Sequence, residues 1–168
     1  QGKLCLGYTT PITNRTRSFP AMQVFNTIFG AGMTSKLFMQ IREARSLCYD
    51  IGSGYHGSKG IVTVSAGIDF DREASVREQV LELLAQCGRG EFTREELTAA
   101  KQALISQLQS THDSPGSIEN YYASGLLSGL NKTPEAYIAA VEAVTAEQVA
   151  QAARSLKLHT IYFLKGVR

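Results

Sequence analysis

Two long side chains that donate hydrogen bonds, Arg42 and Tyr49, lie close together along the chain and flank a predicted turn from a helix into a strand. Arginine presents a rigid, planar set of N–H donors that fits a carbonyl or a carboxylate group. A tyrosine hydroxyl can donate to a polarised carbonyl, or to the oxyanion that forms when a peptide bond is attacked. If both side chains project into one cleft, they would hold an extended peptide in register. The alternative is that Arg42 is a solvated helix residue and Tyr49 is a half-buried strand residue.

Metal ligands and nucleophiles form no recognisable pattern in the sequence. A zinc peptidase needs two histidines on one helical face and a carboxylate that activates water. His56, His112 and His159 are widely separated, and neither HxxEH nor the same motif in reversed order occurs. The GxSxG turn of serine hydrolases is also missing. We therefore predict no catalytic residue, no metal ligand and no cofactor in this chain. An unrelated small α/β enzyme that acts through a histidine or a cysteine is kept as a minor hypothesis.

Two glycines, Gly30 and Gly32, precede the helix that carries Arg42. A phosphate-binding loop follows a strand and opens a helix, whereas this loop follows a predicted helix and lacks the Gly-Lys-Ser/Thr ending. The loop is better explained as a chain reversal between two helices. Glycine would serve there because a positive φ or a close approach of two backbones is needed. Gly30 and Gly32 are thus predicted to support the site that Arg42 and Tyr49 form.

The elements that must position these residues follow from hydrophobic spacing and helix-capping residues. Strands are expected where apolar side chains alternate, and helices where they recur every three or four residues. Serine or threonine before proline, or three residues before glutamate or glutamine, is typical of a helix start. The predicted order is strand 3–10, helix 20–29, a second helix capped by Thr34 or Ser35, a hairpin of strands 48–55 and 61–68, several helices within 71–156, and strand 158–164.

This order predicts an α/β domain of the two-layer α+β kind. Its sheet should be largely antiparallel, because hairpins need antiparallel pairing, and helices should cover one face. At 168 residues, the chain is expected to be a single domain, residues 1–168. Because it begins at Gln1 and enters a strand almost at once, we expect it to be a piece of a longer protein.

Composition narrows the classes of partner. A net charge of +2 is too small to favour a nucleic acid, and no apolar run is long enough to cross a bilayer. Cys5, Cys48 and Cys87 are odd in number and widely spaced, which argues against a disulfide framework and a zinc knuckle. Unpaired thiols favour a reducing compartment, so we expect a bacterial cytoplasmic location.

At these residues the chain resembles a known family. The run FGAGMTSKLFMQIRE (29–43), followed by SLCY (46–49), resembles the insulinase/pitrilysin family of zinc peptidases, which includes the mitochondrial processing peptidases. It is similar to the non-catalytic domain of that family, where G-G-G-M-S-S-R-L-F-x-x-[IL]-R-E-x-x-G-L-x-Y is typical. The opening KLCLGY (3–8) and the helix start GEFTREELTAAK (90–101) also resemble that domain. The four differences in the central motif are at Ala31, Thr34, Lys36 and Ser46, and none removes a group assigned to the chemistry.

The resemblance implies both a fold and a role. In that family, two homologous α/β domains form each half of a clamshell, and one domain of the pair carries the zinc motif. The other lacks the metal but contributes an arginine and a tyrosine that contact the bound peptide. By motif position these would be Arg42 and Tyr49. The peptide would lie extended along a sheet edge of the catalytic half, with Arg42 holding a backbone carbonyl and Tyr49 donating to the scissile carbonyl.

The leading hypothesis is therefore the non-catalytic, substrate-binding domain of an insulinase-like zinc metallopeptidase. It would complete a peptide-binding chamber with a homologous zinc-bearing domain or subunit, in the same chain or in another, and zinc would belong to that partner. The second hypothesis is a pseudo-enzyme module that serves as a scaffold or interaction domain. A half that normally faces a partner can expose an apolar patch, so a homodimer is also expected as a partner state of the isolated piece.

Overall fold

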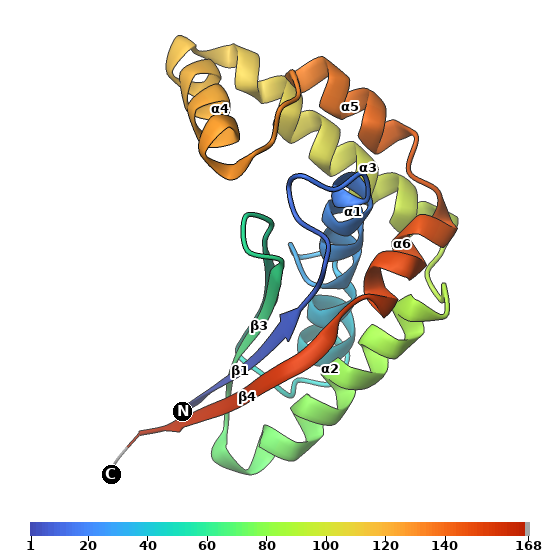
Figure 1. Ribbon diagram of the computed structural model, residues 1–168. Coiled ribbons are helices and arrows are strands. Elements are labelled where there is room, and N and C mark those ends of the chain that lie inside the picture. The colour runs from blue at the N-terminus through green and yellow to red at the C-terminus, as the bar shows by residue number, and fades with distance from the viewer. Residues whose placement is uncertain (167–168) are drawn as a thin grey trace.

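The structure, a computed structural model, describes residues 1–166. One sheet lies against a layer of helices (Figure 1). In chain order they are β1 (Gly2–Thr9), α1 (Phe19–Phe29), the π-helix η1 (Phe38–Glu43), β2 (Asp50–His56), β3 (Ile61–Ile68), the short η2 (Phe70–Arg72), α2 (Glu73–Gly88), α3 (Arg94–Gln109), the short η3 (Ser110–Asp113), α4 (Pro115–Ser128), α5 (Pro134–Glu142), α6 (Ala146–Arg154) and β4 (Lys157–Lys165).

The four strands form one antiparallel sheet in the order β2-β3-β1-β4. β1 lies in the middle, with Leu4 opposite Ala66 of β3 and Phe163 of β4. The first and last strands of the chain are therefore neighbours, and β2 and β4 are the two edges. The predicted fold class, a largely antiparallel α+β sheet with helices on one face, is confirmed.

The core lies between the sheet and the helices. Leu4, Leu6 and Tyr8 alternate along β1 and are buried on the helix-facing side. Phe25 and Phe29 of α1 stack on each other and are fully buried beneath it. Each such side chain contributes about 1.5–3 kcal/mol by leaving water, so this face determines which side of the sheet the helices cover.

The helix starts follow the predicted capping signals. Thr93 accepts a hydrogen bond from the Glu96 N–H, and the Glu96 carboxylate accepts one from the Thr93 N–H, which makes a capping box at α3. Thr145 and Gln148 make the same pair of bonds at α6. Such caps contribute about 1 kcal/mol each. Ser114 caps α4, which projects away from the sheet together with the end of α3 (Figure 1).

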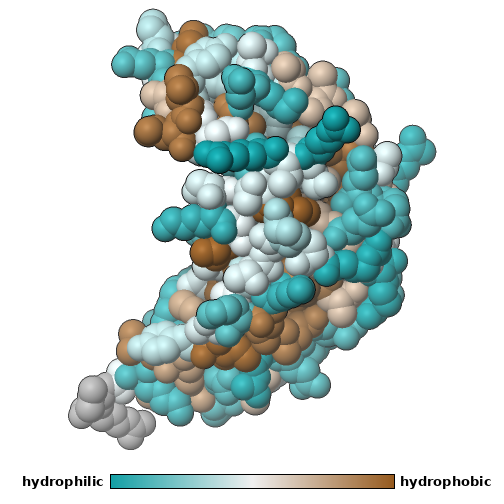
Figure 2. Space-filling view, viewed as in Figure 1, coloured by the Kyte–Doolittle hydropathy of each residue, from teal (hydrophilic) through white to brown (hydrophobic). Residues whose placement is uncertain are grey.

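The surface is mixed, with hydrophobic areas at two places in the view of Figure 2. One is at α4, where Leu126 and Leu127 are almost fully exposed. The other follows the course of β4, which carries several exposed apolar side chains. Among residues 1–166, no helix combines the length and the apolar character that a membrane crossing requires.

Two local predictions differ from the structure around the helix that carries Arg42. The helix winds as a π-helix, with the Ala44 N–H donating to the Met39 carbonyl at 3.0 Å. Its predicted cap, Ser35, instead donates its hydroxyl to the Gly32 carbonyl, and the next strand begins at Asp50 rather than Cys48. In a π-helix each backbone hydrogen bond spans five residues, whereas it spans four in an α-helix. The wider turn therefore uses more residues before the chain reaches the start of β2.

Candidate functional site

Each of the two glycines before the π-helix stands where a side chain would be unfavourable. A Cβ at Gly30 would lie only 2.5 Å from the Ser53 hydroxyl and 2.7 Å from Leu37, so a side chain there would clash with β2. The Gly30 carbonyl also accepts a hydrogen bond from the Ser53 N–H at 2.9 Å. Gly32 has a φ of 114°, a conformation that side chains rarely allow. The predicted chain reversal between two helices is thus present. Its Gly30 is also hydrogen-bonded to the edge strand β2.

Arg42 lies in the last turn of the π-helix and is partly exposed. Its guanidinium stacks over the Phe38 ring at 4.7 Å, a cation–π contact one turn earlier. The nearest carboxylate oxygen, on Glu43, is 3.9 Å from Nε, beyond hydrogen-bond distance. Within residues 1–166 the Arg42 side chain makes no hydrogen bond. Its donors therefore remain available to a ligand, while Phe38 limits the orientation of the planar group.

The turn after the π-helix depends on Ser46, the one non-glycine residue with a positive φ (50°) within residues 1–166. Its N–H donates to the Arg42 carbonyl at 3.0 Å, and the next N–H, of Leu47, donates to Ile41 at 3.1 Å. These bonds close the end of the helix and direct the chain toward the sheet. Glycine adopts this left-handed conformation without strain, so the turn would accept a glycine at this position.

Tyr49 lies just before β2, with its N–H donating to the Gly67 carbonyl of β3 at 2.8 Å. The side chain is 50% exposed, and its hydroxyl donates to the Asp69 carboxylate at 2.9 Å. This hydrogen bond, together with the negative charge of Asp69, raises the pKa of the Tyr49 phenol. A tyrosine phenol is neutral near pH 7 without such a shift, so the contact with Asp69 orients the hydroxyl, which can donate or accept a hydrogen bond.

Cys48, between Arg42 and Tyr49, is a half-buried thiol. Burial and the charge of Asp50 raise its pKa to about 11, and the nearby Arg42 charge opposes the rise. A thiol with such a pKa is not a nucleophile near neutral pH, because the thiolate is the reactive form.

A partly buried ion pair lies just before the π-helix. The Lys36 side chain is only 7% exposed, and its ammonium lies 3.1 Å from the Glu96 carboxylate at the start of α3. Because Glu96 also completes the capping box with Thr93, one carboxylate connects the π-helical segment to the helix layer.

The residues that the structure describes show no cluster that could hold a zinc ion. No group of three or more histidine, cysteine, aspartate or glutamate side chains converges within the described residues. His56 ends β2, His159 lies in β4, and His112 is paired with Glu135 at 2.9 Å.

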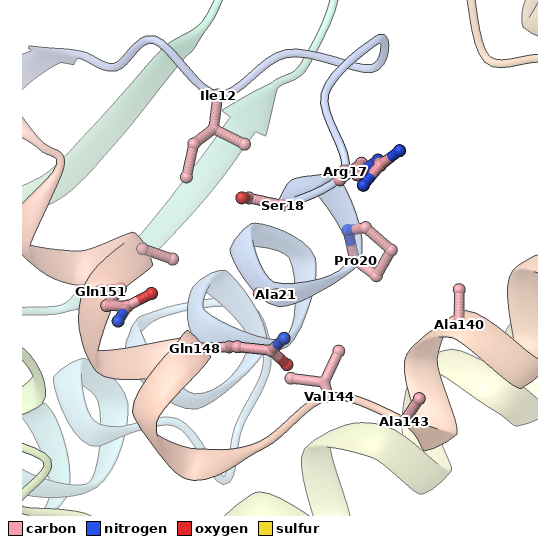
Figure 3. A pocket seen from close by; sticks show the side chains of 11 residues that line it. Ile12, Arg17, Ser18, Pro20, Ala21, Ala140, Ala143, Val144, Gln148 and Gln151 are labelled. Carbon is pink, nitrogen blue, oxygen red and sulfur yellow. The ribbon is translucent and has the colours of Figure 1, made fainter.

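Arg42 and Tyr49 are not among the lining residues of the five surface hollows described for residues 1–166. One hollow of about 420 Å³ lies between the start of α1 and helices α5 and α6 (Figure 3). Two of its polar side chains are engaged within α6, because the Gln148 amide oxygen accepts from the Thr145 N–H and the Gln151 amide donates to Glu147. We interpret this hollow as a gap between packed helices. The candidate site is instead the open surface that carries the Arg42 and Tyr49 side chains.

Sequence reasoning missed three residues of this site. Asp69 could not be found, because its contact with Tyr49 depends on how β2 and β3 pair. Phe38 stands one helical turn before Arg42, a spacing from which the stacking contact could have been proposed. Lys36 was noted only as a replacement for arginine, and its burial against Glu96 is a tertiary feature.

The chain is similar to known proteins over most of its length. Residues 1–104 match the family described as the peptidase M16 inactive domain, in agreement with the resemblance inferred from the sequence. A Bacillus subtilis protein named probable inactive metalloprotease YmfF is 32% identical over 99% of this chain and 39% of its own length. Another B. subtilis relative, named uncharacterized zinc protease YmxG, is 31% identical over 93% of this chain and 39% of its own length.

Solved structures agree. A conserved protein from Enterococcus faecalis V583 superposes with a TM-score of 0.92 at 34% identity, over 99% of this chain and 40% of that one. A peptidase M16 inactive domain from Pseudomonas fluorescens shares the fold, with a TM-score of 0.82 at 22% identity over 96% of this chain and 40% of that one. The chain therefore spans about two fifths of the length of these relatives.

Proposed function

We propose, from the premise that this chain belongs to the peptidase M16 inactive-domain family, that it is the non-catalytic, substrate-contacting part of a larger peptidase assembly. It would complete a peptide-binding chamber with a homologous zinc-bearing domain, in the same chain or in a separate subunit. Relatives of this chain are named zinc proteases, whereas its own described residues form no metal site. Any zinc chemistry is therefore assigned to the companion domain.

One observation carries the proposal. Arg42 and Tyr49, at the two ends of one helix-to-strand turn, are both accessible to a ligand. The guanidinium stacks on Phe38 and makes no hydrogen bond within residues 1–166, with the Glu43 carboxylate 3.9 Å from Nε. The half-exposed Tyr49 hydroxyl donates to Asp69.

The hydrogen bonds define what each group can do. A guanidinium has five N–H donors and no acceptor, so Arg42 would bind peptide carbonyls or a carboxylate side chain. The single proton of the Tyr49 hydroxyl is shared with Asp69 at 2.9 Å. To donate to a peptide carbonyl, the hydroxyl must therefore rotate away from Asp69, and in its present orientation it can only accept from a peptide N–H.

The experiment is Tyr49→Phe in the full assembly with its zinc-bearing domain. Removing one donor from a developing oxyanion costs about 3–4 kcal/mol, so kcat/KM should fall about 10²- to 10³-fold. Tyr122→Phe is the matched control, because Tyr122 is similarly exposed (46%) and lies on α4, outside this turn. Arg42→Gln should raise KM, while Arg45→Gln in the same turn should not. Unchanged turnover and unchanged peptide affinity for Tyr49→Phe would show that the assigned role is wrong.

A second candidate function has its own supporting observation. The relative YmfF, which this chain matches over 99% of its length, is named a probable inactive metalloprotease. The parent of this chain would then be a pseudo-enzyme that binds peptides or serves as a scaffold. Peptide hydrolysis by the full assembly that is lost on adding a chelator would favour the peptidase. Peptide binding without hydrolysis, weakened by Arg42→Gln, would favour the scaffold.

A further inference from the structure

We propose that the β4 edge of the sheet is a docking surface for an extended segment of a different polypeptide, one with an apolar centre and acidic residues at its ends. The segment would add a fifth strand beside β4. This inference is independent of the function proposed for Arg42 and Tyr49, which lie near the opposite edge strand β2.

The backbone of β4 is available for pairing. β4 has nine residues and makes its only extensive contact, within residues 1–166, with β1. Within residues 1–166, one edge of the strand therefore carries N–H and C=O groups that no neighbouring strand uses. Long, uncovered edges of this kind recruit another strand unless they are protected.

The side chains of β4 are apolar on both faces of the sheet. Leu158 and Ile161 share the helix-facing side with the half-buried Phe163, because they pair with Tyr8, Leu6 and Leu4 of β1. Tyr162 and Leu164 lie on the other side. The four exposed side chains are 41–56% exposed, and Figure 2 shows hydrophobic surface along this strand. An added strand would cover part of each.

The charges of β4 select among occupants. Lys157 and Lys165 stand at its two ends, and the strand contains no acidic residue. In an antiparallel pair of two copies centred on Ile161, Lys157 would face Lys165, and in a parallel pair each lysine would face its own equivalent. Like charges directly opposite each other are destabilising, whereas opposite charges contribute favourably. The lysines thus disfavour a second copy of this chain and favour acidic residues at the ends of a partner strand.

The test uses the 168-residue chain and two synthetic peptides as long as β4. Both have the same valine, isoleucine and threonine centre, and they carry either glutamate or lysine at each end. We expect the glutamate-ended peptide to bind about fivefold more tightly at low salt, from two charge pairs, and this preference should shrink at high salt. Hydrogen exchange should slow in β4 and not in β2. A peptide methylated on the backbone nitrogens of one edge should lose binding.

Two variants separate charge from apolar contact. Lys157→Glu combined with Lys165→Glu should reverse the preference between the two peptides. The control Lys59→Glu removes an exposed lysine in the turn between β2 and β3 and should leave it unchanged. Leu164→Thr should weaken both peptides equally.

Three outcomes would overturn the proposal. The first is equal affinity for the two peptides, or no binding of either at millimolar concentration. The second is protection of β2 instead of β4. The third is a dimer of the chain alone in which β4 is already protected, because a second copy would then be the occupant.

Discussion

Ser46→Gly should stabilise the protein, although it removes a side chain. Ser46 has a φ of 50°, in the left-handed region, where an L-residue pays about 1–2 kcal/mol. Glycine adopts this conformation without strain. Its greater freedom in the unfolded chain, however, lowers the free energy of unfolding by about 0.5–1 kcal/mol. The Ser46 side chain is exposed, and within residues 1–166 its hydroxyl makes no hydrogen bond, so little else is lost. The expected net gain in the free energy of unfolding is about 0.5–1 kcal/mol.

Urea denaturation measures this gain as a higher midpoint with an unchanged slope. For a chain of this size, about 1 kcal/mol corresponds to roughly 2–4 °C in Tm. Two matched variants isolate the cause. Ser46→Ala keeps the left-handed strain and should change the free energy by less than about 0.5 kcal/mol. Ala44→Gly, two residues earlier at a φ of −77°, should destabilise by about 0.5–1 kcal/mol.

The reasoning would be refuted if Ser46→Gly were no more stable than Ser46→Ala. Glycine would then be acting only through the unfolded state, as it does at Ala44, and the left-handed turn would carry no strain. The result also bears on the candidate site, because this turn determines how Arg42 and Tyr49 are spaced.

Three further predictions concern stability and its pH dependence. Tyr8→Phe should raise the free energy of unfolding by about 1 kcal/mol in thermal or urea denaturation, because the buried Tyr8 hydroxyl has no hydrogen-bond partner within residues 1–166. A lower stability of this variant would contradict the absence of a partner. Glu96→Ala should lower the free energy of unfolding by about 2–3 kcal/mol, because it leaves the buried Lys36 ammonium unpaired and removes the cap of α3. Lys36→Met should lower it by less, because the remaining Glu96 carboxylate is partly exposed. The reverse order would contradict this interpretation of the ion pair. Burial raises the pKa of the Cys87 thiol from 9.0 to about 12, so the folded state holds this proton more tightly than the unfolded chain does. The contribution of the neutral thiol to the free energy of unfolding is therefore complete below about pH 9 and is lost as the pH rises toward 12. Cys87→Val should flatten the fall in stability over that window, and an unchanged slope would exclude this thiol as its source.

The fold was largely predictable because its signals are local. Alternation in β1 and β3, and the threonine caps before α3 and α6, depend on neighbouring residues, and each was confirmed. The π-helix was not predictable in the same way, because apolar spacing is nearly the same for α and π windings over a single turn. The difference is decided by where the end of the helix must meet β2 and by the left-handed Ser46.

The sequence by itself determined the family, the absence of a zinc motif from this chain, and Arg42 and Tyr49 as the candidate pair, because motif spacing is written along the chain. Only the tertiary structure decided the surroundings of that pair. Asp69 reaches Tyr49 because two strands align in one register, Glu96 reaches Lys36 because α3 packs against α1, and β4 becomes an edge of the sheet within residues 1–166 because it pairs with β1. These contacts join residues far apart in sequence, and their geometry arises only when the core is packed.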